Sequence, residues 1–420
     1  MWAVAAAALC VALEVGANLF YLAAVGGFFY SRQPEVAAAS EVPDMFQTRQ
    51  AVLHPYFGFV NNSERRDPWE GDFAAANNNG FQFAGARLDS DPGCCDVPHA
   101  RRPDEVVIGV FGGSVGVGFS LWSQLRPVFA EALQRDPRFA GKKINVLTFS
   151  LSGFRQPQQL GVLAYYLALG QQFDVVVNID GFNEVVNSHI NWKDKLEPTY
   201  PADSVWGAMG RALEQGRIAQ NAPDALLASW HQMAAGEARK AKQDCSFAAC
   251  YAYHHARTLW HAIRQASLQR RSQEAVAALS WFPARHRYTF ETPDFELWDY
   301  IADRWRDSSI LMNRMLAGSG TQYLHVLQPN QWYHDAGPYT PIAPDHIYGW
   351  VIDPVNQAYP KFLARADALR SAGVPFLDAT HIFPDNGHEI YADDCCHYTE
   401  RGNALLAEAV AKAIIDNAPK

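Results

Sequence analysis

A serine flanked by glycines is the residue in this sequence whose setting best suits nucleophilic chemistry. Ser114 lies in the run Gly112-Gly113-Ser114-Val115-Gly116, which fits the G-x-S-x-G pattern of a nucleophile elbow. The run follows an apolar stretch at 106–108, which predicts a buried strand, and it precedes a helical pattern at 121–133. Glycines at such a turn allow the sharp bend that holds a serine hydroxyl clear of a sheet, so Ser114 is a candidate nucleophile.

Two other interpretations fit the same glycine-rich turn. One is a phosphate site at the start of a helix, and the other is a turn that only packs a helix against a sheet. No Gly-Lys-Ser/Thr follows, which excludes a P-loop, and Gly116-Val117-Gly118 lacks the third glycine of a dinucleotide-binding fingerprint. The residues downstream therefore decide between catalysis and packing.

Three further polar blocks lie where predicted elements end or begin. Gly153 follows a predicted strand at 144–150, Asn183 follows another at 174–179, and His397 precedes the last predicted helix. In an open α/β sheet the carboxyl ends of the strands form the ligand crevice. We therefore expect these blocks to meet Ser114 at one edge of the sheet.

The chemistry of the blocks is complementary. His397 is expected to accept the Ser114 proton and return it to the leaving oxygen, while Asp394, three residues earlier, holds the imidazole. Asp393 is the alternative carboxylate partner of His397. The three-residue spacing between Asp394 and His397 favours Asp394. The amides of Ser114 and Gly153 and the side chain of Asn183 are the expected donors to the tetrahedral oxyanion.

The blocks resemble those of the SGNH, or GDSL-like, hydrolase superfamily, whose name gives a serine, a glycine, an asparagine and a histidine in this order. The resemblance covers roughly 106 to the C-terminus without an insertion. It implies an α/β fold, a flavodoxin-like three-layer sandwich with a parallel sheet of about five strands. Gly113 stands where many members have Asp, and the third block reads Gly-Phe-Asn-Glu where Gly-x-Asn-Asp is commoner. Neither departure removes a catalytic atom.

An ordinary α/β-hydrolase is the alternative fold for a G-x-S-x-G motif. In that fold the acid and the histidine normally come from separate loops, and the serine follows a central strand. Here the serine comes first, and the Asp-His pair is local and last in the chain. The order of these residues favours the SGNH type.

Strand and helix patterns divide the chain into three parts. We expect a transmembrane anchor at 1–33, an irregular extension with short strands at 34–105, and an SGNH hydrolase-like domain at 106–420. Expected strands at 106–111, 144–150, 174–179, 322–327 and 374–377 alternate with helices, which predicts a parallel sheet covered on both faces. A helical insertion at about 187–295 interrupts this domain. Its helical patterns at 223–242 and 254–279 have no strand between them, and its histidines are expected on a helix face and not at a metal.

The N-terminal segment has membrane-spanning length. Residues 2–30 are apolar apart from Glu14 and Asn18, and we expect an uncleaved helix in the bilayer, with a signal peptide as the alternative. Glu14 and Asn18 lie on one helical face, which predicts a contact with a membrane-protein partner because a carboxyl group in lipid is costly. The alternative is a tilted interfacial position. The lone Arg32 after the segment favours a cytoplasmic domain, whereas the cysteines favour an extracytoplasmic, periplasmic one, and we give the cysteines more weight.

The cysteines fall in local clusters once Cys10 of the apolar segment is set aside. Their spacing does not match zinc ligands, so no metal site is expected and disulfides are predicted instead. Cys245 and Cys250 are expected to close a short loop. A second prediction joins the remaining clusters across the fold, one or both of Cys94 and Cys95 with Cys395 and Cys396.

Composition excludes some classes of function. The 420 residues carry a formal net charge of -9, and no long Lys/Arg run offsets it, so no nucleic-acid partner is expected. No metal or organic cofactor is implied. We expect a membrane-anchored serine esterase or deacylase of the bacterial envelope that removes O-acyl groups, O-acetyl among them, from a glycan or lipid. Two alternatives stay open: an O-acyltransferase, and a non-catalytic accessory subunit of a membrane complex built on the same fold.

Overall fold

The chain divides into two compact units. A computed structural model describes residues 2–31, 51–61, 63, 74–85, 95–194, 196–202, 233–238, 240–241, 245–277, 295–342, 349–384 and 386–418. The smaller unit comprises Met1–Asp44 and Gly210–Ala284, and the larger one comprises Met45–Met209 and Arg285–Lys420. The larger unit contains Ser114 and His397.

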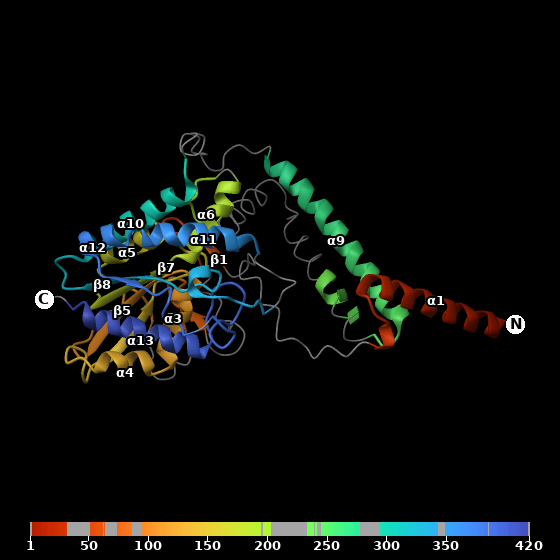
Figure 1. Ribbon diagram of the computed structural model, residues 1–420, viewed down its shortest axis with the longest axis horizontal. Coiled ribbons are helices and arrows are strands. Elements are labelled where there is room, and N and C mark those ends of the chain that lie inside the picture. The colour runs from red at the N-terminus through yellow and green to blue at the C-terminus, as the bar shows by residue number, and fades with distance from the viewer. Residues whose placement is uncertain are drawn as a thin grey trace. The chain divides into compact units, whose positions relative to one another are not determined.

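A five-stranded parallel sheet forms the centre of the larger unit (Figure 1). Its strands are β5 (Glu105–Gly112), β6 (Lys143–Thr148), β7 (Val175–Asp180), β8 (Gln322–Leu327) and β9 (Phe376–Asp378). They lie in the order β6-β5-β7-β8-β9, and each neighbouring pair is parallel. Every residue of β5, β7 and β8 is buried, which explains their almost continuous apolar sequence. This strand order is that of flavodoxin-like folds, and it confirms the predicted fold class.

Helices cover both faces of the sheet (Figure 1). One layer holds α3 (Ser114–Leu125), α4 (Val128–Gln134) and α13 (Glu400–Asp416), of which α3 contacts β5, β6 and β7. The opposite layer holds α5 (Gln158–Ala168), α6 (Phe182–Lys193), α10 (Leu297–Leu316), α11 (Gly349–Leu363) and α12 (Ala366–Ser371). The result is the expected three-layer sandwich.

Two boundaries differ from the sequence prediction for physical reasons. The helix expected at 121–133 is two helices, because Arg126 precedes Pro127 and a residue before proline is disfavoured in helical conformation. The first of them, α3, already begins at Ser114, so the candidate nucleophile is its first residue. The last strand begins at Phe376, two residues later than expected.

Two short hairpins precede the sheet. β1 (Ala51–His54) pairs with β2 (Gly58–Asn61), and β3 (Ala74–Ala76) pairs with β4 (Gln82–Ala84), both antiparallel. Phe57, Phe59 and Phe81 from this region are buried in the same apolar core as the sheet. The described part of the extension is therefore attached to the larger unit by its aromatic residues.

The smaller unit is helical. It contains α1 (Trp2–Val25), the 3-10 turn η1 (Phe29–Ser31) and α9 (Ala248–Ala277). Ala17, Tyr21 and Phe29 form a buried apolar cluster with Cys245 and Ala248 at the start of α9. The predicted division assigns the insertion to the hydrolase-like domain, whereas its helix α9 packs on α1. Most of the helix predicted at 223–242 lies outside the described residues.

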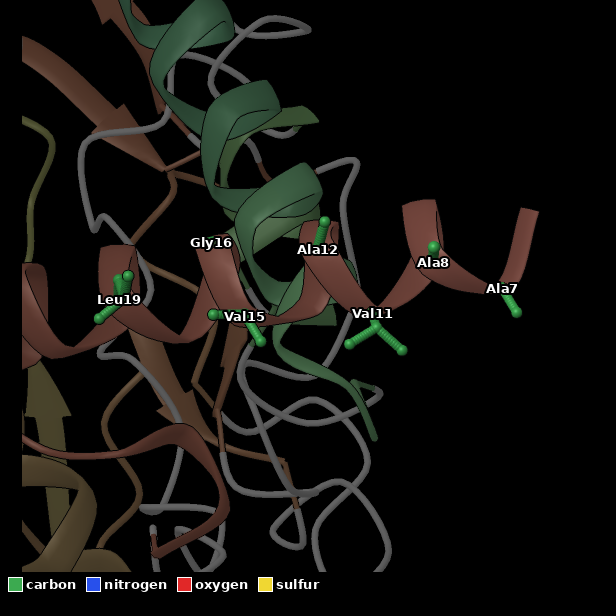
Figure 2. Close-up of a pocket in the computed structure, with 7 residues that line it drawn as sticks. All are labelled: Ala7, Ala8, Val11, Ala12, Val15, Gly16 and Leu19. Atoms are coloured by element: carbon green, nitrogen blue, oxygen red, sulfur yellow. The ribbon is translucent and has the colours of Figure 1, made fainter. Parts of the chain in front are cut away.

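One helix in the described part of the chain is long and apolar enough to cross a membrane, over Ala7–Val25 of α1. A signal sequence near an N-terminus has the same length and composition. That this helix is an uncleaved membrane anchor is therefore part of the function proposed below. Figure 2 shows an open apolar hollow along this helix, lined by Ala7, Ala8, Val11, Ala12, Val15, Gly16 and Leu19. The hollow shares no residue with the Ser114 site.

Glu14 and Asn18, the face predicted to contact a membrane-protein partner, are engaged within the chain. The Glu14 carboxylate accepts hydrogen bonds from the backbone N–H groups of Ala248 (2.6 Å) and Ala249 (3.0 Å) and from the Tyr30 hydroxyl. The Asn18 side chain donates to the Glu14 carbonyl (3.2 Å). A carboxylate at the first turn of a helix satisfies amides that have no intrahelical acceptor. This carboxyl group therefore has partners without a second protein, and a membrane partner stays a prediction.

Candidate active site

Ser114 stands at a tight turn between β5 and α3. Gly112 has a φ of 148° that disfavours any side chain, and a Cβ there would lie 2.1 Å from the Ile179 carbonyl oxygen of the neighbouring strand. The close approach of β5 to β7 therefore requires glycine at this position. Because the chain turns here, the partly exposed Ser114 begins α3 beyond the end of the sheet.

A serine, a histidine and an aspartate form a hydrogen-bonded chain at this turn. The Ser114 Oγ lies 2.8 Å from His397 Nε2, and His397 Nδ1 lies 2.5 Å from Asp393 Oδ2. The His397 side chain is 30% exposed, so a substrate can reach it. This is the geometry of a serine nucleophile, its general base and a carboxylate that orients the base.

The carboxylate partner of His397 is Asp393, and the prediction of Asp394 is wrong. Asp394 is buried, and its Oδ1 accepts hydrogen bonds from the Tyr339 hydroxyl (2.7 Å) and the Ile342 backbone N–H (2.7 Å). Its backbone carbonyl accepts a further bond from the Trp332 indole (2.7 Å). Asp394 therefore anchors the catalytic loop to the segment after β8, while its neighbour contacts the imidazole.

A second oxygen of Asp393 organises the loop around it. Asp393 Oδ1 accepts the backbone N–H groups of Cys395 (2.9 Å), Cys396 (3.0 Å) and His397 (3.2 Å). These bonds curl the backbone around one carboxylate oxygen and leave the other for the imidazole. Because the backbone bends around Asp393 in this way, the carboxylate reaches the imidazole of a residue four positions later. The spacing of the residues in the sequence does not show this bend.

The interaction between Asp393 and His397 favours the protonated, positively charged form of the histidine. Burial disfavours the imidazolium, but the hydrogen bond and charge of Asp393 outweigh it and raise the pKa of His397 to about 9. Burial likewise works against ionisation of Asp393, and its bonds to His397 and the loop amides bring its pKa below the ordinary value. Asp393 is thus placed to stabilise an imidazolium at His397, as a carboxylate does beside a general base.

Two of the expected oxyanion donors, the Ser114 amide and the Asn183 side chain, lie at this turn. Asn183, in the first turn of α6, donates from Nδ2 to the Phe154 carbonyl (3.0 Å), and a Cβ on Gly113 would lie 2.0 Å from that nitrogen. The Asn183 side chain therefore lies directly over Gly113, the residue before Ser114. Gly153 lies in the loop after β6, where its carbonyl accepts from Asn187 of α6 (3.3 Å). The structure brings Asn183 next to the serine and ties the Gly153 loop to the same helix.

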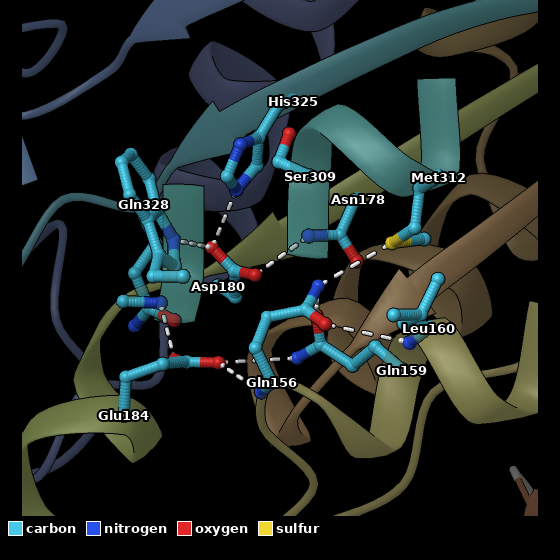
Figure 3. Close-up of polar contacts among 12 residues, drawn as sticks. Gln156, Gln159, Leu160, Asn178, Asp180, Glu184, Ser309, Met312, His325 and Gln328 are labelled. Atoms are coloured by element: carbon cyan, nitrogen blue, oxygen red, sulfur yellow. Dashed lines mark hydrogen bonds and ion pairs between the residues drawn. The ribbon is translucent and has the colours of Figure 1, made fainter. Parts of the chain in front are cut away.

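Glu184 holds these two donor segments together. Its buried carboxylate accepts the backbone N–H of Gln156 (2.8 Å), which follows the Gly153 loop (Figure 3). It also accepts the backbone N–H of Gly181 (2.8 Å), the residue before α6. Burial and the nearby charge of Asp180 raise the pKa of Glu184, and the amide bonds oppose them in part. The sequence shows Glu184 only as a departure from the commoner Asp of the third block. Its role depends on contacts that spacing does not reveal.

A buried polar cluster lies behind Glu184 at the end of β7. Asp180 Oδ1 contacts His325 Nε2 (2.8 Å), and Oδ2 accepts from the Asn178 side chain (2.6 Å) (Figure 3). Asp180 Oδ1 also accepts from the Trp305 indole (2.7 Å). These bonds satisfy a carboxylate that is 2% exposed and fix the end of the strand from which the Asn183 turn departs.

The cysteines confirm one predicted disulfide and contradict the other. Cys245 and Cys250 are joined, with an S–S distance of 2.08 Å. Cys395 and Cys396 are free thiols, so the predicted bond from Cys94 or Cys95 to the catalytic loop is wrong. Cys95 is disulfide-bonded, and Cys94 lies outside the described residues.

Two groups of described side chains bring sulfur and imidazole atoms within 4.8 Å of one another. In the group of Cys245, Cys250 and His254 both sulfurs are used by the disulfide. In the group of Cys395, Cys396 and His397 both ring nitrogens contact Asp393 and Ser114. Neither arrangement offers a metal its full ligand set without breaking these contacts.

Comparison with known proteins gives structural neighbours alone. No protein-family model and no curated protein sequence matches the chain. Among solved structures, the chain is similar to a lipase from a goat rumen metagenome, with 12% identity, a TM-score of 0.37, and 73% of this chain and 97% of the other covered. It is also similar to a GDSL-like lipase from Bacteroides thetaiotaomicron, with 10% identity, a TM-score of 0.36, and 79% and 97% covered. A lipase/acylhydrolase from Enterococcus faecalis has 10% identity, a TM-score of 0.32, and 75% and 97% covered.

Proposed function

We propose that this protein is an SGNH-type serine esterase that cleaves O-acyl groups, including O-acetyl, from a glycan or lipid of the cell envelope. The observation that carries the proposal is the chain of contacts from Ser114 through His397 to Asp393. A hydroxyl 2.8 Å from an imidazole that is itself held by a carboxylate is activated for attack on an acyl carbonyl.

The reaction follows from the positions of these side chains. His397 Nε2 removes the proton from Ser114 Oγ as that oxygen bonds to the acyl carbon, and Asp393 stabilises the imidazolium. The carbonyl oxygen becomes negative, and the Ser114 and Gly153 amides with the Asn183 side chain are its proposed donors. His397 then gives its proton to the leaving alcohol. Water, deprotonated by the same imidazole, cleaves the acyl-enzyme and regenerates the free serine.

The envelope as the place of action rests on two features of the smaller unit. The helix over Ala7–Val25 suits an anchor, and the Cys245–Cys250 disulfide suits an oxidising compartment such as the periplasm. An enzyme anchored in this way meets acylated glycans and lipids at the membrane surface. Those are therefore the proposed substrate class.

The test is labelling of the purified full-length protein with a fluorophosphonate probe, alongside hydrolysis of a short-chain aryl ester. We expect labelling and turnover in the wild type and their loss in Ser114→Ala and His397→Ala. Ser152→Ala, which removes a partly exposed serine from the block after β6, is the matched control and keeps both. A folded wild-type protein that is neither labelled nor active would contradict the proposal and favour the accessory-subunit alternative.

Transfer is separated from hydrolysis by the fate of the acyl group. With an acylated glycan as donor and a second sugar as acceptor, an esterase releases the free acid, whereas an acyltransferase acylates the acceptor. We expect the free acid. Predominant formation of the acylated acceptor would reassign the same triad to transfer.

A further inference from the structure

The catalytic loop carries a pair of adjacent thiols between its acid and its base. Cys395 and Cys396 follow Asp393 in the loop and precede His397 directly. Both are free, and their sulfur atoms lie 3.0 Å apart. That separation is already shorter than the roughly 3.5–4.0 Å between non-bonded carbon atoms, which are smaller than sulfur. The backbone therefore presents the two sulfurs to each other.

The loop pair differs from most of the other described cysteines in being reduced. Cys245 and Cys250 are joined, and Cys95 is disulfide-bonded. Among the cysteines that the structure describes, the loop pair and Cys10 of α1 are the ones that are free. A protein with stable disulfides resides where thiol oxidants are present, so the loop pair meets them too.

A bond between adjacent cysteines is reversible by its geometry. Neighbouring Cα atoms are held about 3.8 Å apart by a trans peptide, which is below the roughly 4.4–6.8 Å usual in disulfides. A disulfide forced into this spacing is strained and more easily reduced. Labile disulfides of this kind are typical of regulatory cysteines.

The pair is positioned to control the base. The backbone N–H groups of Cys395, Cys396 and His397 all bond Asp393 Oδ1. Burial raises the pKa of the Cys396 thiol well above its ordinary value. The Cys396 sulfur lies within 4.8 Å of a ring nitrogen of His397, and the Cys396 amide helps to hold Asp393. Closing an eight-membered ring between these two residues changes the torsions of the peptide that joins them, and with them the directions of the two amides that bond Asp393.

We propose that Cys395 and Cys396 form an oxidative modification site, in which a reversible disulfide between adjacent residues disassembles the Asp393–His397–Ser114 chain. The reduced form is the assembled one described above, and the inhibitory effect rests on the proposed esterase function. The co-reactant is a small-molecule or protein disulfide. Cys395, the more accessible of the two, attacks one of its sulfurs and releases a first thiol. Cys396 then attacks the Cys395 sulfur and releases the second thiol, so two electrons and two protons pass to the oxidant.

The experiment equilibrates the full-length protein in mild detergent with reduced or oxidised glutathione, followed by alkylation and peptide mass spectrometry. We expect the peptide that contains Cys395 and Cys396 to carry two alkyl groups after reduction, and to lose both and two hydrogen atoms after oxidation. Hydrogen exchange of the three amides that bond Asp393 is expected to be faster in the oxidised protein. Fluorophosphonate labelling is expected to fall at least about tenfold on oxidation and to return with dithiothreitol.

Two variants separate this site from the other cysteines. Cys395→Ser is expected to be labelled equally in both buffers, because no ring can close. Cys245→Ser/Cys250→Ser, which removes the other disulfide, is expected to respond as the wild type does. A pair that stays reduced at the most oxidising ratio, or that closes without changing amide exchange, would overturn the inference. A reduced protein that is never labelled would refute the esterase while the mass and exchange readouts still decide the disulfide.

Discussion

The assignment of Asp393 and not Asp394 as the partner of His397 can be tested by exchanging each carboxyl group for an amide. The pKa of His397 is raised from 6.5 to about 9, so at about 1.36 kcal/mol per pKa unit its surroundings stabilise the imidazolium by roughly 3 kcal/mol. Asp393→Asn removes that charge and can hold the wrong imidazole tautomer. We therefore expect kcat/KM at about pH 10, where the imidazole is neutral in both proteins, to fall by between roughly 100-fold, from the charge alone, and 10,000-fold, when the tautomer is lost as well.

The pH profile gives a second, independent readout. Only the neutral imidazole accepts a proton, so wild-type kcat/KM should rise with pH until His397 is deprotonated, near pH 9. In Asp393→Asn the effect of burial is left unopposed, and it lowers the pKa of His397. The rise in activity should then move to below about pH 7.

Asp394→Asn is the matched control, because the asparagine carbonyl can still accept from Tyr339 and Ile342. We expect it to keep kcat/KM within about threefold and to keep the wild-type pH profile. The assay is aryl ester hydrolysis from pH 5 to 10, with thermal unfolding to show that both variants fold. Equal losses in two well-folded variants, or an unchanged pH profile in Asp393→Asn, would refute the reasoning.

Three further predictions concern the surroundings of the site and the smaller unit. Gly113→Ala places a methyl group where the Asn183 amide lies, so kcat should fall on the order of 100-fold with little change in KM. In the double variant Gly113→Ala/Asn183→Ala, kcat should be little lower than in Gly113→Ala alone. Glu184→Gln leaves one acceptor oxygen for two backbone amides, so kcat should fall roughly tenfold while substrate binding is nearly unchanged; a rise in KM alone would contradict it. Glu14→Ala removes the acceptor at the start of α9, so amide exchange over 248–255 should speed up in detergent while ester hydrolysis is unaffected.

The fold was largely readable from the sequence because it depends on periodic patterns. Runs of apolar residues at 106–111, 174–179 and 322–327 mark strands that helices cover on both faces, and these strands form with nearly the expected bounds. The glycines around Ser114 mark the turn, since only glycine fits at Gly112 where β5 approaches β7. Such features are local, and local steric rules suffice to predict them.

Only the tertiary structure showed which of two neighbouring aspartates contacts His397. Asp393 and Asp394 are chemically identical, and only the curl of the loop around Asp393 Oδ1 turns one carboxylate to His397 and the other to Tyr339. The same curl brings the sulfurs of the two loop cysteines together, where the sequence pointed to a distant partner.

Long-range packing decided the role of the carboxyl group in the N-terminal helix. The sequence shows Glu14 as a polar residue in an apolar helix, but its hydrogen-bond donors, Ala248 and Ala249, lie 234 and 235 residues away along the chain. Residue types and periodicity therefore determined the sheet and pointed to Ser114 and His397 as the proposed nucleophile and base. The partners of the charged groups depended on backbone directions and on contacts between distant segments, which a linear pattern does not contain.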